Sequence, residues 1–188
     1  MYFTSANFLL RSLYPSAIWK IPDNGKKIFL TFDDGPVPEV TPQVLSILRK
    51  YNAKATFFCI GANIEKHPEI FQQIVSEGHS IGNHTYNHLN GWKTKTKIYL
   101  DNIERCEHSL QSAIDHLRLD NRKQKTENRK SLFRPPYGKM KRSQISLLQP
   151  HFSLVMWDVL SGDFDERTSE EKCLRNVICN AGEGSIIL

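Results

Sequence analysis

Two histidines, His84 and His88, are four residues apart, a spacing that lets both rings face one metal ion. Asp33 and Asp34 are adjacent carboxylates at the end of an apolar segment, where two negative charges are costly unless a cation or an arginine compensates. Asp34 would complete a set of two histidines and one carboxylate that leaves a position open for water. Taken alone, each cluster has a simpler alternative, a pair of surface histidines or a polar Asp-Asp-Gly turn.

A third polar segment, 133–138, has the sequence Phe-Arg-Pro-Pro-Tyr-Gly. Arg134 stands beside a rigid proline turn, which would hold its guanidinium in a fixed direction for a bidentate grip on a carboxylate. The same turn would expose the backbone N–H of Tyr137, a candidate donor to a developing oxyanion. A structural loop explains this segment alone, but the three clusters together favour one functional site.

Apolar runs alternate with helical periods along the chain, and each polar cluster follows a predicted strand. Strands are predicted at 27–32, 55–60, 80–81, 132–133, 152–157 and 184–188, and helices from 41, from 67, over 97–117 and over 168–179. The last helix is expected to place four apolar side chains inward, those of Cys173, Leu174, Val177 and Ile178. This alternation is typical of an α/β domain with a mainly parallel sheet. Because a complete eight-unit barrel needs ~250 residues, these 188 residues predict an open or shortened barrel.

The three clusters, in this order, resemble the motifs of the polysaccharide deacetylase family with its NodB-homology domain. The motifs correspond to Thr-Phe-Asp-Asp-Gly-Pro at 31–36, His-Thr-Tyr-Asn-His at 84–88 and Arg-Pro-Pro-Tyr-Gly at 134–138. The resemblance implies a shortened, distorted (β/α) barrel of the NodB type. We interpret residues 26–188 as this catalytic domain and residues 1–25 as an N-terminal extension packed on it.

The resemblance also implies an activity, the metal-dependent hydrolysis of N-acetyl groups from the amino sugars of a chitin-like or peptidoglycan-like polysaccharide. Asp33 would be the general base, Arg134 would position it, and the amide of Tyr137 would contribute to the oxyanion hole. A divalent metal, usually zinc in this family, would be held by Asp34, His84 and His88. The expected partner is therefore an N-acetylated glycan.

The C-terminal part of the chain departs from the family pattern. Asp163 matches the second acidic position of the fourth motif, whereas Leu160 and Phe164 replace an aspartate and a tryptophan that are common there. The family follows its last strand with a histidine that acts as general acid, and here the corresponding strand, 186–188, ends the sequence. We therefore expect a truncated last strand region, a chain that is a fragment, and poor deacetylation by these 188 residues.

Two alternatives to a working deacetylase remain. A carbohydrate-binding domain that keeps the metal but lacks turnover is the stronger one, because the C-terminal histidine is missing. A phosphotransferase of the Asp-x-Asp type is weaker, because Asp33 and Asp34 adjoin and no phosphate-cradling glycine loop is evident. The identity of the glycan and the oligomeric state stay open.

Composition and charge narrow the class of protein. Hydrophobic residues make up 39% and charged residues 24%, which argues against a disordered chain. No apolar run reaches the ~18 residues of a membrane span and no signal peptide is evident, so only the substrate class suggests the cell envelope. The net charge is 25 − 20 = +5, most of it in the basic segment 118–130, and nucleic acid is not an expected partner. The four cysteines are interpreted as buried thiols.

Overall fold

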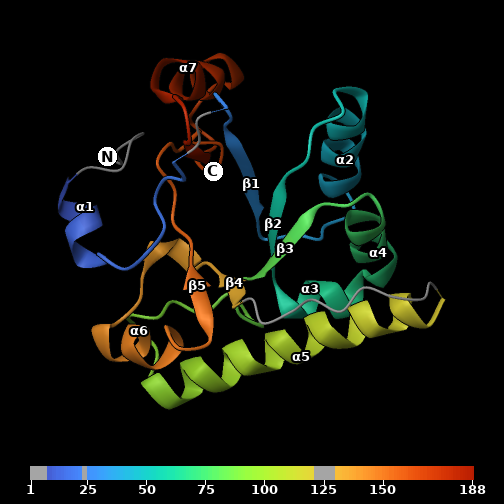
Figure 1. Ribbon diagram of the computed structural model, residues 1–188, viewed down its shortest axis with the longest axis vertical. Helices are drawn as coiled ribbons and strands as arrows, with labels where there is room; N and C mark the ends of the chain where they lie inside the picture. Colours follow the sequence, from blue (N-terminus) through green and yellow to red (C-terminus); the bar gives the residue numbers. More distant parts are fainter. Residues whose placement is uncertain (1–7, 23–24, 121–129) are drawn as a thin grey trace. The chain divides into compact units, whose positions relative to one another are not determined.

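The computed structural model describes residues 8–22, 25–120 and 130–188, and its strands hydrogen-bond in the order β5-β4-β3-β2-β1-β6 (Figure 1). They are β1 (Phe29–Asp33), β2 (Thr56–Cys59), β3 (Ser80–Asn83), β4 (Ser131–Phe133), β5 (Phe152–Leu154) and β6 (Ile186–Ile187). β2 pairs in parallel with β3, β3 with β4, and β1 with β6. Each predicted strand is present, and the predicted α/β class with a mainly parallel sheet is confirmed.

The chain forms two compact units, one of Phe32–Ser153 and one that combines the residues up to Thr31 with Leu154–Leu188. The three motif clusters lie in the unit Phe32–Ser153, except for Thr31, the first residue of the first motif, which belongs to the other unit. The boundary between an N-terminal extension and a catalytic domain at 25/26 stays a prediction.

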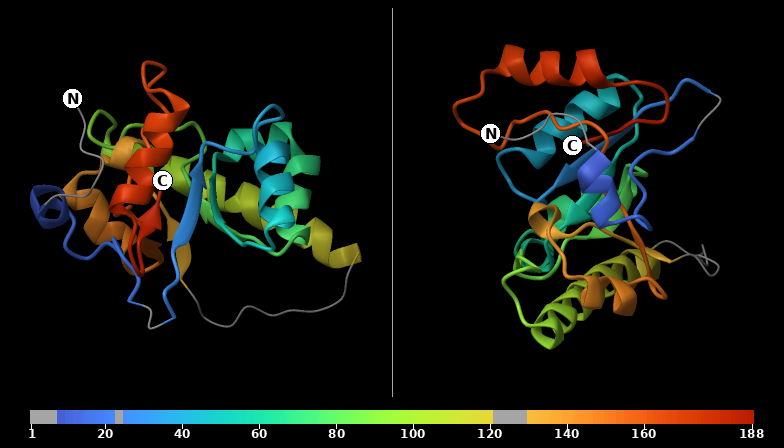
Figure 2. Two further views of the ribbon diagram at one scale, coloured as in Figure 1. Left: turned by 90° about the horizontal axis from the view of Figure 1, so that it is seen from above. Right: turned by 90° about the vertical axis from the view of Figure 1, so that its left-hand side faces the viewer.

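In the unit Phe32–Ser153, helices pack around β2, β3 and β4. They are α2 (Thr41–Lys50), α3 (Gly61–Lys66), α4 (Pro68–Ser76), α5 (Thr96–Asp120) and α6 (Arg142–Leu148). The long helix α5 contacts α3, α4 and α6, and α2 lies beside α4 (Figures 1 and 2). This unit has its own apolar core, which includes the fully buried side chains of Phe58, Phe71, Tyr99, Ile103 and Phe133. Burying one such aromatic or aliphatic side chain contributes about 1.5–3 kcal/mol.

The local sequence explains the two main helices of this unit. Pro68 begins α4, where its missing N–H has no intrahelical partner to lose. In α5 the predicted helix 97–117 is confirmed with bounds 96–120. Its buried residues Tyr99, Ile103, Cys106 and Leu110 recur at steps of three and four, which places them on one face.

In the other unit, the first residues of β1 pair with β6, Phe29 opposite Ile186 and Leu30 opposite Ile187. The Thr31 hydroxyl adds a hydrogen bond to the Ile187 carbonyl at 2.7 Å. This unit also contains α1 (Phe8–Leu13) and α7 (Glu170–Asn180). The apolar side chains of Tyr14 and Trp19 are buried in the same unit.

The inward face predicted for α7 is wrong. Leu174 and Ile178 are exposed, and no residue of this helix is buried. The helix is capped by Ser169, whose hydroxyl accepts a hydrogen bond from the Lys172 N–H, so it begins at Glu170, two residues later than predicted. Helical period decides which side chains share a face, but only contacts with distant residues decide whether that face is covered.

Several smaller expectations also need correction. The short helices α1, α3 and α6 were not predicted, because a helix of one or two turns carries too few residues for a periodic signal. Of the four free cysteines, Cys59 and Cys106 are buried as predicted, whereas Cys173 is half-buried and Cys179 is exposed. Residues 121–129 of the basic segment lie outside the described residues. Among the helices of the described ranges, none combines the length and apolar character that a membrane crossing requires.

Candidate active site

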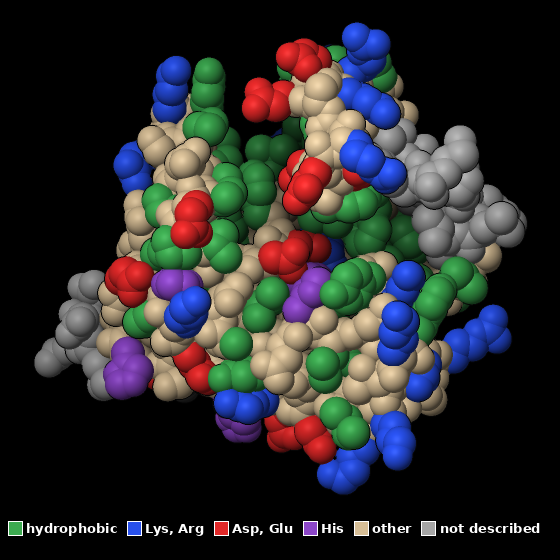
Figure 3. All heavy atoms as spheres, turned by 180° about the vertical axis from the view of Figure 1, so that it is seen from behind, with side chains coloured by type: hydrophobic (Ala, Val, Ile, Leu, Met, Phe, Trp, Pro, Cys, Tyr) green, Lys and Arg blue, Asp and Glu red, His purple; other side chains and the backbone are tan. Residues whose placement is uncertain are grey.

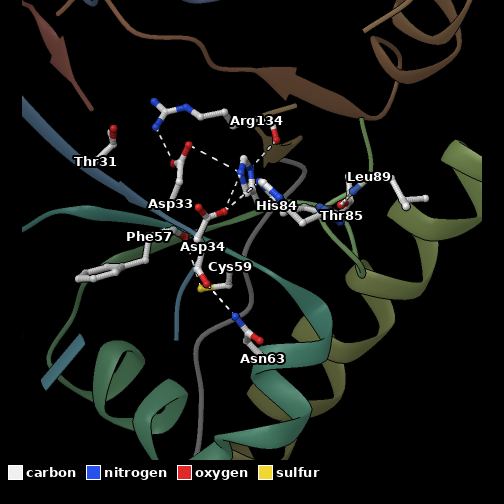
Figure 4. Close-up of polar contacts among 12 residues, drawn as sticks. Thr31, Asp33, Asp34, Phe57, Cys59, Asn63, His84, Thr85, Leu89 and Arg134 are labelled. Carbon is white, nitrogen blue, oxygen red and sulfur yellow. Dashed lines mark hydrogen bonds and ion pairs between the residues drawn. The ribbon is translucent and has the colours of Figure 1, made fainter. Parts of the chain in front are cut away.

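The ends of three parallel strands bring the polar clusters together at one edge of the sheet. Asp33 is the last residue of β1, His84 directly follows β3, and Arg134 directly follows β4. Asn83 and Phe133, the residues before His84 and Arg134, are register partners in the β3–β4 pair. Since parallel strands end at the same edge, residues that are distant in the sequence meet there, as Figure 4 shows.

Asp34, His84 and His88 form the group predicted to hold a metal. The Asp34 carboxylate Oδ1 lies 3.4 Å from His84 Nε2 and 3.1 Å from His88 Nε2. One ligand atom from each of these residues lies within 4.8 Å of the others. Ligand bonds of ~2.0–2.2 Å in a tetrahedral site separate neighbouring donors by about 3.3–3.6 Å, so these side chains fit a small divalent ion.

The local environment prepares these three side chains as ligands. His84 Nδ1 donates to the Arg134 carbonyl oxygen at 2.8 Å, so Nε2 is the ring nitrogen that faces Asp34 and would bind a metal. Partial burial opposes ionisation of Asp34, but hydrogen bonds and charges from His84 and His88 hold the pKa of its carboxyl well below the ordinary range. His84 is buried, whereas the Asp34 carboxylate is 60% exposed, so the group opens to solvent on one side.

Asp33 is held by a buried cation. Arg134 is completely buried, and its Nη1 donates to Asp33 Oδ1 at 2.8 Å. The guanidinium carbon lies 4.2 Å from the centre of the Phe58 ring, which fixes the arginine further. The other carboxylate oxygen, Oδ2, lies 3.8 Å from His84 Nε2, so Asp33 reaches the metal group from one side (Figure 4). Burial lowers the pKa of Arg134 and the Asp33 carboxylate opposes this, so the guanidinium stays charged.

Four non-glycine residues of the site have a left-handed backbone. The φ angles are 68° at Asp34, 63° at Thr85, 54° at His88 and 60° at Tyr137. Each such conformation costs on the order of 1–3 kcal/mol and persists only where surrounding contacts enforce it. Residues of this kind gather at functional sites, so their convergence on the three clusters is independent support for a site here.

The Tyr137 ring lies against the metal group, 4.6 Å from the His88 ring between centroids, and is 59% exposed. Tyr137 sits in the short turn Pro136–Gly138, as predicted for the proline segment. The proposed oxyanion role of its N–H stays a prediction.

Asp163 belongs to the other unit, where it is exposed and its carboxylate accepts a hydrogen bond from the Ser161 hydroxyl at 2.8 Å. Its expected catalytic role therefore stays a prediction too. Leu160 and Phe164, the two positions that depart from the fourth motif, lie in the same unit. Leu160 is buried and Phe164 is exposed.

The structure adds residues that sequence reasoning missed, and they hold the segment 84–88 in place. The side-chain oxygen of Asn102, Oδ1, accepts hydrogen bonds from the backbone N–H groups of Tyr86 and Asn87, at 2.9 and 3.0 Å. The Tyr86 hydroxyl donates to Glu65 at 2.6 Å, and Ser109 donates to the other oxygen of the same carboxylate at 2.7 Å. These two hydrogen bonds lower the pKa of Glu65.

Part of this support was visible in the sequence. Asn102, Arg105 and Ser109 are spaced by three and four residues on the predicted helix, so they share one face. Arg105 places its guanidinium carbon 3.6 Å from the centre of the Tyr86 ring. That spacing does not predict that these side chains support the segment around Tyr86.

The sequence of the chain matches a known family. The family model described as polysaccharide deacetylase matches residues 20–151. The chain belongs to the polysaccharide deacetylase family.

Named relatives and a solved structure agree with this assignment. The chain is 39% identical over 168 residues to a peptidoglycan-N-acetylglucosamine deacetylase of Bacillus cereus, which covers 89% of this chain and 56% of the relative. It is 34% identical over 170 residues to a chitooligosaccharide deacetylase of Azorhizobium caulinodans, covering 90% and 75%. It thus spans little more than half of the Bacillus cereus relative.

The fold has a counterpart in the crystal structure of the Bc1960 peptidoglycan N-acetylglucosamine deacetylase in complex with 4-naphthalen-1-yl-N-oxidanyl-benzamide. The TM-score is 0.81 at 34% identity, covering 97% of this chain and 79% of that chain. The prediction of a shortened barrel of the deacetylase type is confirmed.

Proposed function

We propose that this chain is the catalytic part of a metal-dependent deacetylase that hydrolyses N-acetyl groups of amino sugars in a glycan. One observation carries the proposal: a metal-sized group of Asp34, His84 and His88 lies directly beside an ionised carboxylate, Asp33, that is not needed to complete it. Metal binding alone does not require a second carboxylate that is fixed by a buried arginine. A hydrolase that must remove a proton from water does.

The cofactor that fits is a divalent ion, and two imidazoles with one carboxylate favour zinc. When bound, such an ion would supply Lewis-acid polarisation of the acetamide carbonyl and would acidify water. The residues that would hold it are Asp34, His84 and His88.

Three of the remaining roles fall to this chain's own side chains and backbone, whereas the proton that the leaving amine must take up has no assigned donor among the described residues. Asp33 takes the proton of the attacking water, a contribution of ~10²–10⁴ in rate for a positioned base. Arg134 holds the Asp33 carboxylate aimed toward the reacting water. The Tyr137 N–H donates to the oxyanion that develops on the acetamide, a donor worth about 2.7–4 kcal/mol in comparable sites.

The substrate class is an N-acetylated glycan. The named relatives are deacetylases of peptidoglycan and of chitooligosaccharides, and both polymers present the same acetamide group. Peptidoglycan is a cell-wall polymer, so the cell envelope is the proposed place of action.

Acetate release tests the proposal directly. Wild-type protein loaded with zinc should release acetate from N-acetylglucosamine oligomers or from peptidoglycan, and Asp33→Asn should lose ~10²–10⁴ of this rate while it retains the metal. Asp34→Asn and His88→Ala should instead lower the metal content of the purified protein. Lys66→Gln, an exposed change on α3, is the control and should alter neither quantity.

Two results would contradict these assignments. If Asp33→Asn loses the metal while Asp34→Asn keeps it, the two aspartates have exchanged roles. If the wild type binds one zinc per chain and releases no acetate from either substrate, and a chain that continues to the family's C-terminal histidine also releases none, the domain is the non-catalytic carbohydrate-binding domain that the sequence left as the alternative.

A further inference from the structure

The segment that follows His88 is joined to the segment that follows Tyr137. The Trp92 indole N–H donates to the Met140 carbonyl at 3.1 Å, and the Gly91 N–H donates to the Lys139 carbonyl at 3.1 Å. From the other side the Lys141 ammonium donates to the Thr94 carbonyl at 2.7 Å. The two segments therefore form one surface with fixed geometry.

Two buried features hold this surface rigidly. The Gln144 side chain is completely buried, and its amide donates to the Gly91 carbonyl at 3.0 Å. A Cβ on Gly91 would lie 2.5 Å from the Lys139 carbonyl oxygen, so the two backbones approach as closely as only glycine permits.

This surface lies next to the active site. Trp92 follows His88 by four residues, which limits their separation to about 14 Å even for a fully extended chain. On the other segment, Lys139 follows Tyr137 by two residues, and the Tyr137 ring is in contact with the His88 ring. A polymer with one sugar unit in the active site can therefore reach this surface with a neighbouring unit.

The charge of the surface is one-sided. Segments 91–97 and 139–144 contain six Lys and Arg residues and no Asp or Glu. Lys97 pairs with Asp101, and the other five have no carboxylate partner among the residues that the structure describes. These five define the cationic surface: Lys93, Lys95, Lys139, Lys141 and Arg142. In Figure 3 the Lys and Arg side chains gather at lower right, over α6 and the first turns of α5.

An aromatic ring is part of the same surface. Trp92 is 49% exposed, yet its indole is fixed by the Met140 carbonyl, and Lys139 Nζ lies 5.4 Å from the ring centre. A large ring held half in solvent beside uncompensated cations is unusual for a merely solvated face. An aromatic face presents an apolar plane that a sugar ring can cover, and neighbouring ammonium groups attract carboxylates.

We propose that Trp92 and the cationic surface form a subsite for an acidic N-acetylated glycan, with a sugar ring on Trp92 and carboxylates of the same polymer on the lysines. The inference rests on the proposed function, because the polymer is the one whose acetamide enters the active site. It adds a preference for a glycan that carries carboxylates over a neutral one such as a chitin oligomer.

A matched pair of substrates tests the preference. The first is a peptidoglycan fragment with free carboxylates, and the second is the same fragment with those carboxylates converted to methylamides. For the wild type at low salt, KM for the free acid should be on the order of tenfold lower, with equal kcat, because exposed ion pairs act on ground state and transition state alike. The difference should shrink between 0.1 M and 1 M salt, where the screening length falls from ~10 Å to ~3 Å.

Variants assign the effect to the surface. The double change Lys95→Gln and Arg142→Gln should remove most of the difference in KM between the two fragments. The control double change, Lys50→Gln and Lys66→Gln, removes the same charge from α2 and α3 and should retain it. Trp92→Ala should raise KM for both fragments about equally. Trp92→Phe keeps an aromatic ring, so its KM values should lie close to those of the wild type. Thermal unfolding of each variant verifies that it folds.

Direct binding keeps this test separate from the proposed function. Both fragments are titrated calorimetrically into the protein whether or not acetate is released. No acetate from either fragment, together with tighter binding of the free acid, would reject the enzyme and leave the subsite standing. Equal binding and equal KM of the two wild-type fragments would overturn the subsite. Polyglutamate that binds as tightly as the free-acid fragment, without any dependence on Trp92, would also overturn it, since the surface would then recognise charge alone.

Discussion

Replacing Arg134 with methionine separates the structural role of the Asp33–Arg134 pair from its chemical role. The guanidinium is completely buried and donates to Asp33 at 2.8 Å, and the Asp33 side chain is itself only 14% exposed. Methionine fills a similar volume over the Phe58 ring but leaves the carboxylate without its cation. Removing one partner of a buried ion pair costs about 3–5 kcal/mol, because the other charge remains buried and uncompensated.

The magnitude is measured by a double-mutant cycle. We expect Arg134→Met to lose about 3–5 kcal/mol of unfolding free energy in urea, and Asp33→Asn also to lose unfolding free energy because it removes the carboxylate that faces the buried guanidinium. The double variant carries neither charge, so it should be clearly more stable than the sum of the two losses implies. All four proteins are compared in the presence of a chelator, which removes any contribution from bound metal.

Acetate release then completes the experiment. The double variant should recover stability without recovering activity, because the proposed base is absent from it. Losses that add within about 0.5 kcal/mol would show that the two side chains are not energetically coupled. Turnover by the double variant within about tenfold of the wild-type rate would show that Asp33 is not the base. Either result would refute the reasoning given for this pair.

Three further predictions follow from other parts of the molecule. A chelator should lower Tm in calorimetry, because a metal at 100 times its Kd stabilises the folded state by about 2.7 kcal/mol; an unchanged Tm would argue against a metal site. Tyr86→Phe removes the hydroxyl that donates to Glu65, and should raise the Kd for zinc on the order of threefold by loosening the segment 84–88. An unchanged zinc titration would mean that this hydrogen bond does not position the histidines. Burial raises the pKa of Cys106 to about 12 and that of Cys59 further, so both thiols should resist alkylation at pH 8 in the native protein. The exposed Cys179 should react, and labelling of Cys59 or Cys106 by mass spectrometry before unfolding would contradict the structure.

The sequence by itself determined the class of fold and predicted which polar side chains lie close together. Apolar runs and helical periods are local signals, so they predicted each strand and the long helix α5 within a few residues. Because the polar clusters directly follow strands, and parallel strands end at one edge, Asp33, His84 and Arg134 could be expected to meet before any coordinates were known. The distances between them agree with that expectation.

Only the tertiary structure decided which residues support and extend the site. Glu65 reaches Tyr86, and Met140 reaches Trp92, across 21 and 48 positions of sequence. The hydrophobic periodicity of the sequence cannot predict such contacts, because they depend on how helices and loops pack after the strands have paired. The same reason explains the exposed Leu174 and Ile178 of α7, whose apolar face was evident in the sequence while its covering was not. Local preference selects the elements and their faces, and long-range packing alone selects their partners.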